Sequence, residues 1–277
     1  TLYGYEEGWV IGTGRQNDLV EKVRTEASSL QMFLSHLDER TWSSESTSKG
    51  WTIEDVVAHL AGNIDNWTNN IIRAVAGDFT PPEGQAFLSP RERASHPIGP
   101  GARESRRISG PQILDTFIAG HDRFQKVLET LGKEDWDKLC FHRRGVITIS
   151  VFVGLQIQEL ALHGWDIRWG LNRAAELSES CLPVLVDLVP RWIDTAFMTT
   201  IALPTPVTYR FDVSGPVIVR QDLVINSDSY DVLESDIKLP DVIFRCETGN
   251  YILMMYGRLA IEQAVRDGRL SVEGSME

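Results

Sequence analysis

Apolar residues recur at steps of three and four along four long stretches of the chain, a spacing that is typical of amphipathic helices. Thr52 stands just before the second stretch and Asp55 follows it by three residues, which predicts a capping box at the start of that helix. Trp51, directly before Thr52, is placed to fold back onto the new helix. We therefore expect helices over residues 18–37, 52–76, 110–131 and 154–169.

Two further stretches give mixed patterns. Residues 145–152 begin with β-branched side chains and could form a strand, although the run that follows from Gly154 favours a helix. Residues 177–202 have a helical pattern with Pro183 near the start and Pro190 inside. Because an interior proline cannot donate the helical hydrogen bond, Pro190 predicts a kink or a break.

The pattern changes period after the proline-rich segment 203–206. Alternating apolar and polar residues predict a strand over 207–213, and further strands are expected over 216–225, 242–246 and 270–272. Between the last two, residues 252–267 have helical spacing and stop at Gly268. We therefore expect an irregular N-terminal lead-in over 1–17, an all-α four-helix bundle over 18–202 and a small α+β domain over 203–277.

One connection of the predicted bundle is unusually long. Residues 78–110 are rich in Pro and Gly, and a connection of this length is usually functional or mobile. It contains five arginines: Arg91, Arg93, Arg103, Arg106 and Arg107. Either the segment is a lid whose arginines reach an anion, or it is a plain solvated crossover.

Composition narrows the class of protein. The 277 residues are 42% hydrophobic and 24% charged, as in a globular protein that builds its own core. The net charge of −12 argues against a nucleic-acid surface and against binding to anionic membranes. No apolar run is long enough for a membrane span, the three cysteines show no CxxC spacing, and we expect no signal peptide. We expect a cytoplasmic protein, monomeric or homodimeric, with free thiols.

Three residues form a candidate metal site. Glu159 and His163 are four positions apart, so on a helix they lie one turn apart on the same face. His59 lies in the second predicted helix, and bundle cores can hold a metal between facing helices. Two histidines and a carboxylate leave a coordination position open, as catalytic zinc sites do, although iron also accepts this set. The alternatives are ordinary core histidines and a surface Glu–His pair. The apolar neighbours of Glu159 favour the ligand role, because a buried unpaired carboxylate is costly.

The motifs around these residues resemble a known family. They are LDERTW at 37–42, GWTIEDVVAHLAG at 50–62 and ELALHGWD at 159–166. Over about residues 18–172 the chain is similar to the mycothiol-dependent maleylpyruvate isomerases, which belong to the DinB-like metal-binding four-helix bundles. The resemblance implies that His59, Glu159 and His163 bind a divalent metal, usually zinc, that activates the thiol of mycothiol.

The C-terminal residues resemble sterol carrier protein type two more loosely, through GNYILMMYGR at 249–258 and GRLSVEG at 268–274. The resemblance implies that an arginine of this domain helps to bind an anionic substrate. The candidates are Arg258, Arg245, Arg220 and Arg210, each of which could instead be structural. Asp166 could accept a proton from a ligand histidine or cap the helix end, and Arg91 and Arg103 are candidate cofactor-binding residues.

These observations favour a metal-dependent thiol enzyme, a mycothiol-dependent S-transferase or isomerase that acts on a small electrophilic organic substrate. Two alternatives stay open. One is an enzyme of the same fold that uses the metal without a thiol, such as a lyase or cyclase of a secondary biosynthetic pathway. The other is a non-catalytic lipid- or ligand-binding protein whose function lies in the C-terminal domain.

Overall fold

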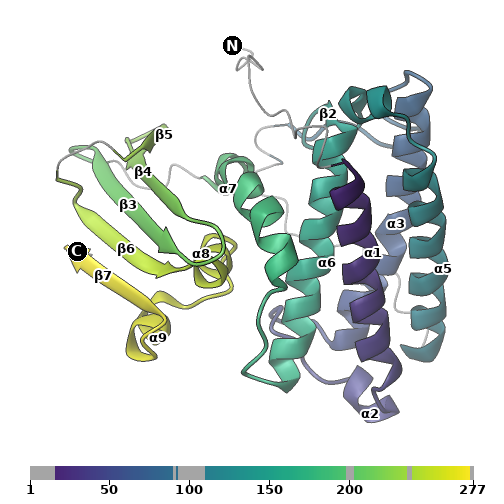
Figure 1. Ribbon diagram of the computed structural model, residues 1–277, viewed down its shortest axis with the longest axis horizontal. Coiled ribbons are helices and arrows are strands. Elements are labelled where there is room, and N and C mark those ends of the chain that lie inside the picture. The colour runs from purple at the N-terminus through teal and green to yellow at the C-terminus, as the bar shows by residue number, and fades with distance from the viewer. Residues whose placement is uncertain (1–15, 90–91, 93–109, 198–202, 236–238, 275–277) are drawn as a thin grey trace. The chain divides into compact units, whose positions relative to one another are not determined.

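The computed structural model describes residues 16–89, 92, 110–197, 203–235 and 239–274 (Figure 1). Their contacts divide the chain into two compact units, with the main boundary between Gly164 and Trp165. This boundary lies earlier than the division between residues 202 and 203 that the sequence suggests. None of the described helices combines the length and the apolarity needed to cross a bilayer.

The first unit is built on four long helices: α1 (Gln16–Ser35), α3 (Ile53–Val75), α5 (Gly110–Glu129) and α6 (Ile149–Leu171), of which α6 ends in the second unit (Figure 1). Helix α5 lies against both α1 and α3. Helix α6 reaches α3 through the rings of Phe152 and Trp67, whose centroids are 4.5 Å apart, and reaches α5 through a bond between Gln156 and His121. The predicted all-α bundle is confirmed.

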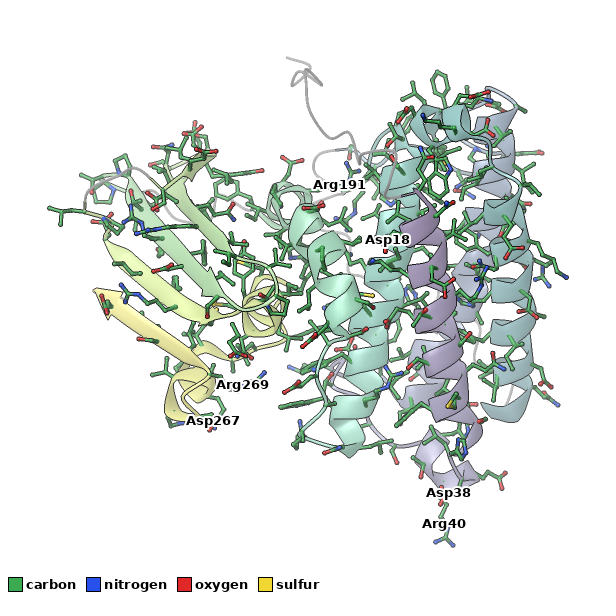
Figure 2. The ribbon with its side chains drawn as sticks, viewed as in Figure 1. Asp18, Asp38, Arg40, Arg191, Asp267 and Arg269 are labelled. Carbon is green, nitrogen blue, oxygen red and sulfur yellow. The ribbon has the colours of Figure 1, made fainter. Side chains whose placement is uncertain are left out.

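Periodic burial explains why these helices assemble. On α1 the side chains of Leu19, Val23, Leu30 and Leu34 recur at steps of four or seven residues, and each is at most 1% exposed. Burying an aliphatic side chain of this size stabilises the fold by roughly 1.5–3 kcal/mol. The short helix α2 (Glu39–Trp42) closes one end of the bundle, where Figure 2 shows its N-cap residue Asp38 beside Arg40.

The predicted capping box begins α3. The backbone N–H of Asp55 donates to Thr52 Oγ1 at 3.2 Å, and the N–H of Thr52 donates to Asp55 Oδ2 at 3.0 Å. Two otherwise unpaired backbone donors are thereby satisfied. The helix ends at Val75 and is followed by Gly77, whose φ of 85° suits glycine. His59 therefore sits two turns inside a helix whose start is well defined.

Residues 139–148 contain a feature that the sequence pattern did not resolve. Strands β1 (Leu139–Cys140) and β2 (Ile147–Thr148) pair antiparallel, and α6 begins immediately afterwards at Ile149. The β-branched start of 145–152 is thus a two-residue strand that runs directly into the fourth helix. The short 3₁₀ helix η3 (Lys133–Asp137) precedes this hairpin and buries Trp136.

The second unit begins with the last turns of α6 and continues with the 3₁₀ helix η4 (Glu179–Cys181) and α7 (Leu182–Ala196). Helix α7 starts later than the predicted 177 and runs through Pro190, so the described part of the chain shows no break there. Helix α7 packs against α8, and Trp192 Nε1 donates to the carbonyl of Met255 at 2.8 Å. These contacts group α7 with the C-terminal sheet.

The sheet has five strands in the order β5-β4-β3-β6-β7, drawn in green to yellow in Figure 1. They are β3 (Val207–Ser214), β4 (Val219–Ile225), β5 (Tyr230–Glu234), β6 (Val242–Glu247) and β7 (Leu270–Gly274). All neighbours are antiparallel except β3 and β6. Helix α8 (Thr248–Met255) packs on β3 and β6. The expected α+β domain is confirmed, while β5, a mostly exposed edge strand, was not predicted.

The helix expected over 252–267 is two helices, α8 and α9 (Ile261–Arg266). Gly257 adopts a φ of 70°, its N–H donates to the carbonyl of Met254, and the N–H of Arg258 donates to the carbonyl of Leu253. This is the Schellman arrangement that terminates helices. The prediction of one continuous helix was therefore wrong. Figure 2 places Asp267, the C-cap of α9, and Arg269 at the turn that leads into β7.

Candidate metal centre

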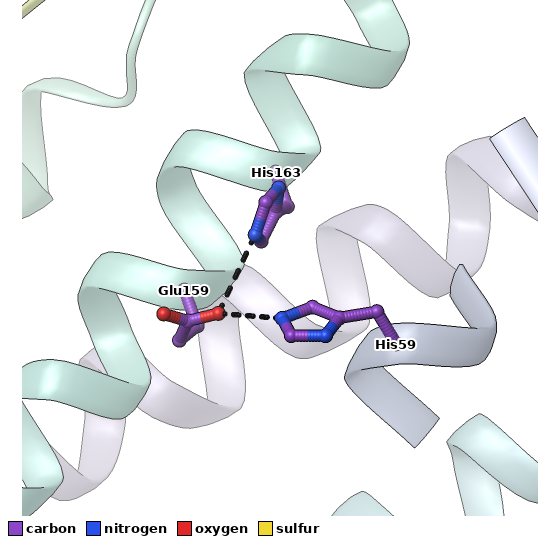
Figure 3. A group of neighbouring side chains, drawn as sticks. All are labelled: His59, Glu159 and His163. Atoms are coloured by element: carbon purple, nitrogen blue, oxygen red, sulfur yellow. Dashed lines mark hydrogen bonds and ion pairs between the residues drawn. The ribbon is translucent and has the colours of Figure 1, made fainter. Parts of the chain in front are cut away.

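The bundle brings His59 of α3 together with Glu159 and His163 of α6, as Figure 3 shows. Glu159 Oε2 lies 3.1 Å from His59 Nε2 and 3.4 Å from His163 Nε2. The two imidazole rings are 5.1 Å apart and nearly perpendicular, with an interplanar angle of 77°. The three side chains that the sequence spacing singled out thus converge on one point between two helices.

The spacing of the donor atoms fits a small divalent cation. One ligand atom from each residue lies within 4.8 Å of the others. Metal–ligand bonds of about 2.0–2.1 Å at tetrahedral angles separate neighbouring ligand atoms by about 3.3 Å. The separations of Glu159 Oε2 from His59 Nε2 and His163 Nε2, 3.1 Å and 3.4 Å, bracket this value, and the remaining separation, between the two histidine ligand atoms, is at most 4.8 Å. Two imidazoles and one carboxylate are also a donor set that zinc accepts with one position left open.

The charge on Glu159 suits a ligand role. Burial acts to raise the pKa of its carboxyl, but hydrogen bonds from His163 and His59 and their positive charge outweigh it, so the pKa falls well below the usual range. The side chain is 28% exposed, which leaves it half-buried rather than sealed in the core. Glu159 is therefore a carboxylate at neutral pH, and it faces the two imidazoles that a cation would share with it.

Trp51 and Asn63 also contact His59, and the sequence did not predict either of them as part of the site. Trp51 meets the imidazole edge-on at 5.5 Å, so its fold-back onto α3 ends at the candidate ligand itself. Asn63 lies one turn after His59, and its Nδ2 is 3.2 Å from His59 Nδ1. The spacing of four residues on a helix was the available indication for Asn63, since i and i+4 side chains are neighbours.

Asp166 and Arg258 contact each other within the second unit. Arg258 Nε donates to Asp166 Oδ1 at 2.9 Å, and Arg258 Nη2 donates to Asp166 Oδ2 at 2.7 Å. The Asp166 side chain is only 2% exposed, so this two-pronged ion pair neutralises a buried charge. A direct catalytic role for either residue stays a prediction.

The other candidate arginines of the C-terminal sheet have different surroundings. Arg210 forms an ion pair with the fully buried Asp222, and Arg245 is paired with Asp212 and Glu273. Arg220 is exposed on β4. Arg91, Arg93 and Arg103 of the long connection lie outside the described residues, so their expected contact with an anion stays a prediction.

Two family models match the chain. Residues 23–168 match the mycothiol maleylpyruvate isomerase N-terminal domain, and residues 205–277 match the SCP-2 sterol transfer family. The first match contains all three candidate ligands, and the second contains the five-stranded sheet. No protein with curated function matches the chain significantly.

Solved structures share the fold at low sequence identity. A crystal structure of the mycothiol-dependent maleylpyruvate isomerase superposes with a TM-score of 0.64 over 95% of both chains, at 15% identity. A mutant of that enzyme gives the same TM-score at 14% identity, again over 95% of both chains. YfiT from Bacillus subtilis, described as a probable metal-dependent hydrolase with an unusual four-helix bundle topology, covers 62% of this chain and 94% of its own at 17% identity, with a TM-score of 0.48.

Proposed function

This chain belongs to the mycothiol maleylpyruvate isomerase N-terminal domain family, and from that premise we propose that it is a metal-dependent thiol enzyme. Its reaction is an S-transfer or an isomerisation of a small electrophilic organic substrate, with mycothiol as the thiol cosubstrate. The observation that carries the proposal is the convergence of His59, Glu159 and His163 at the spacing of a three-ligand cation site.

In this proposal the three residues hold zinc and leave one position open to the cosubstrate. Zinc beside a thiol favours the thiolate at neutral pH, which is the nucleophilic form. The chain's own contribution is geometric: α3 and α6 hold two imidazoles and an ionised carboxylate close together. The Glu159 side chain is 28% exposed, so the ligand set is not sealed from solvent.

The thiolate adds to an electrophilic carbon of the substrate. If the new carbon–sulfur bond persists, the product is an S-conjugate. If the thiol leaves again after rotation about the former double bond, the product is a cis/trans isomer. The second outcome corresponds to the reaction in the name of the matched isomerase. The first requires that the carbon next to the new carbon–sulfur bond take up a proton from water before the thiol leaves.

Anion binding completes the proposal. In this proposal Arg91 and Arg103 bind anionic groups of the cofactor or the substrate, and their replacement by Ala should weaken binding without changing metal content. A direct substrate role for Arg258 would require it to leave Asp166, whose carboxylate is buried. We therefore assign Arg258 and Asp166 first to positioning.

A second candidate function is supported by the match of residues 205–277 to the SCP-2 sterol transfer family. Under this second hypothesis the C-terminal unit binds an apolar ligand and the bundle is not catalytic. Lipid extracted from the purified protein, together with the absence of metal, would favour it. A metal enzyme that uses no thiol is distinguished by turnover in the absence of mycothiol.

The test is a turnover assay on zinc-loaded protein with mycothiol and a series of small electrophiles, following loss of free thiol and formation of isomer. We expect turnover that requires both zinc and thiol and that falls to background in His59→Ala and Glu159→Gln. His36→Ala is the matched control, because His36 is an exposed histidine of the same bundle that bonds the carbonyl of Met32. Turnover that persists in either site variant would refute the assignment.

A further inference from the structure

The amide of Asn63 lies over the imidazole of His59, one helical turn further along α3. Its Nδ2 is 3.2 Å from Nδ1 and 3.5 Å from Nε2 of that ring. Two distances so nearly equal place the amide nitrogen above the face of the ring and not in line with either ring nitrogen. Nε2 therefore still faces Glu159 Oε2, at 3.1 Å.

The oxygen of the same amide is not used by the protein. Among the described residues, no group donates a hydrogen bond to Asn63 Oδ1, although the side chain is half-buried. The buried polar side-chain atoms without a partner in this part of the chain belong to Arg73, Gln125 and Ser235, so Asn63 Oδ1 is in contact with solvent. Because a carboxamide oxygen only accepts, a ligand that it recognises must offer a donor.

This oxygen lies between the candidate ligands and an aromatic contact. His59, Asn63 and Trp67 follow one another at steps of four on α3, so they share one face of the helix. On α6, Phe152 precedes Glu159 by seven residues, which is about two turns. The rings of Trp67 and Phe152 are 4.5 Å apart. Both helices thus carry aromatic side chains two turns from the candidate ligands, with Asn63 halfway between them.

The spacing along α3 limits what can reach the amide oxygen. One turn of about 5.4 Å separates Asn63 from His59. A thiol whose sulfur occupies the open position beside His59 therefore reaches Asn63 with atoms a few bonds from that sulfur. A planar amide suits this place, because its N–H meets the oxygen of Asn63 and its flat face can lie against the half-buried ring of Trp67.

We propose that Asn63 is a specificity-determining residue of the cation site, and that its Oδ1 accepts a hydrogen bond from an amide N–H of the thiol cosubstrate. The cosubstrate is then a thiol that carries an amide a few bonds from its sulfur, and a simple alkyl thiol binds less well. The inference rests on the proposed function, because it presupposes a thiol at a cation held by His59, Glu159 and His163.

The experiment compares two thiols that differ in a single group. They are 3-mercapto-N-methylpropanamide and methyl 3-mercaptopropanoate, in which an ester oxygen replaces the amide N–H. The protein is loaded with Co²⁺, which accepts the same kind of ligand set as zinc. The dissociation constant of each thiol is read from the sulfur-to-cobalt charge-transfer absorbance, and elemental analysis checks that every variant holds the same amount of cobalt.

Wild type should bind the amide about 3–10-fold more tightly than the ester, which is the effect of one hydrogen bond. This preference should be lost in Asn63→Leu, and also in Asn63→Ala, which removes the acceptor without adding apolar bulk. Asn69→Leu is the matched control, since the same exchange is made at an exposed position of the same helix, and it should keep the wild-type preference.

Two results would overturn the inference while leaving a metal-dependent thiol enzyme intact. One is a wild type that binds both thiols equally, and the other is a preference for the amide that persists in Asn63→Leu or Asn63→Ala. A wild type whose cobalt absorbance responds to neither thiol would instead contradict the proposed function and this inference together.

Discussion

His121 is a buried histidine whose surroundings differ from those of His59 and His163. It lies on α5, is 5% exposed, and contacts the ring of Phe117 at 4.0 Å. Its Nδ1 bonds the carbonyl of Phe117 at 2.9 Å, and its Nε2 is 3.2 Å from the amide of Gln156. Burial lowers the pKa of His121 to about 4, although the Phe117 carbonyl and the charge of Asp122 act in the opposite direction. This histidine is neutral and structural, whereas His59 and His163 face a carboxylate.

The low pKa makes His121 a source of acid sensitivity. Between about pH 6.5 and pH 4 the unfolded chain binds a proton here and the folded protein does not. The free energy of unfolding is therefore lost as pH falls through this window, by on the order of 3 kcal/mol in total. In His121→Gln the profile of unfolding free energy against pH should be flatter between pH 6.5 and 4, measured by urea denaturation.

His36→Gln controls for the loss of an exposed imidazole and should keep the wild-type profile. A His121→Gln profile as steep as that of the wild type would contradict the assignment of this acid sensitivity to His121.

At the scale of single residues, the sequence indicated which side chains could bind a metal, because Glu159 and His163 are four residues apart on one helix and such a spacing can be seen in the sequence alone. It could not show that Asn63 contacts the ring of His59 or that Arg258 contacts Asp166. The first depends on a rotamer, and the second joins residues 92 positions apart. The spacing of four residues allows the contact between His59 and Asn63 but is equally common between exposed polar residues of a helix, and no local pattern links Asp166 with Arg258.

The ends of helices could be predicted from the sequence where a capping residue or a terminating glycine marks them. The capping box at Thr52 correctly predicted the start of α3. Gly257 lies inside an apolar run with helical spacing, so the sequence predicted a helix that continues through it. The structure shows why Gly257 ends α8: its φ of 70° is a conformation that other residues adopt at a cost. A β-strand such as β5, which is mostly exposed, lacks the alternation by which a strand is recognised.

Two glycines of this region give a matched test. An added Cβ would meet no atom within 4 Å at Gly257 or at Gly249, so packing does not distinguish them. Only Gly257 has a positive φ, and Gly249 lies inside α8. Gly257→Ala should lower the free energy of unfolding by roughly 1–2 kcal/mol, while Gly249→Ala should leave it unchanged or raise it by up to about 1 kcal/mol.

Urea denaturation followed by far-UV circular dichroism measures both values. Equal losses in the two variants would show that the backbone conformation at residue 257 is not what sets the boundary between α8 and α9.

Over the whole molecule, contacts divide the chain into two units, and the main boundary between them falls inside α6. At residues 203–206 the spacing of apolar residues changes from helical to alternating, which correctly predicted that strands follow the helices. It could not reveal that α7 groups with the sheet, because the contact of Trp192 with Met255 spans 63 residues. Periodicity reports which face of a helix is buried but not which element covers that face.

The ion pair between Asp166 and Arg258 is expected to be a strong determinant of stability in the second unit. Arg258→Met leaves a carboxylate that is 2% exposed without this partner, which should cost about 3–5 kcal/mol of unfolding free energy. The double variant Asp166→Asn, Arg258→Met should recover most of the loss. Arg245→Met, which breaks half-exposed pairs with Asp212 and Glu273, should change stability by about 0–1 kcal/mol.

Stability from urea denaturation and turnover by zinc-loaded protein are measured on the same samples. If Arg258→Met kept its stability and lost only turnover, Arg258 would act on the substrate and the structural interpretation of the pair would be wrong.

The cation shared by α3 and α6 is tested most directly by the metal content of the purified protein. After loading with zinc and exhaustive dialysis, elemental analysis should find about one zinc ion per chain in the wild type and in His36→Ala. It should find almost none in His59→Ala at equal folded content by circular dichroism. Equal zinc in His59→Ala and wild type would contradict the account.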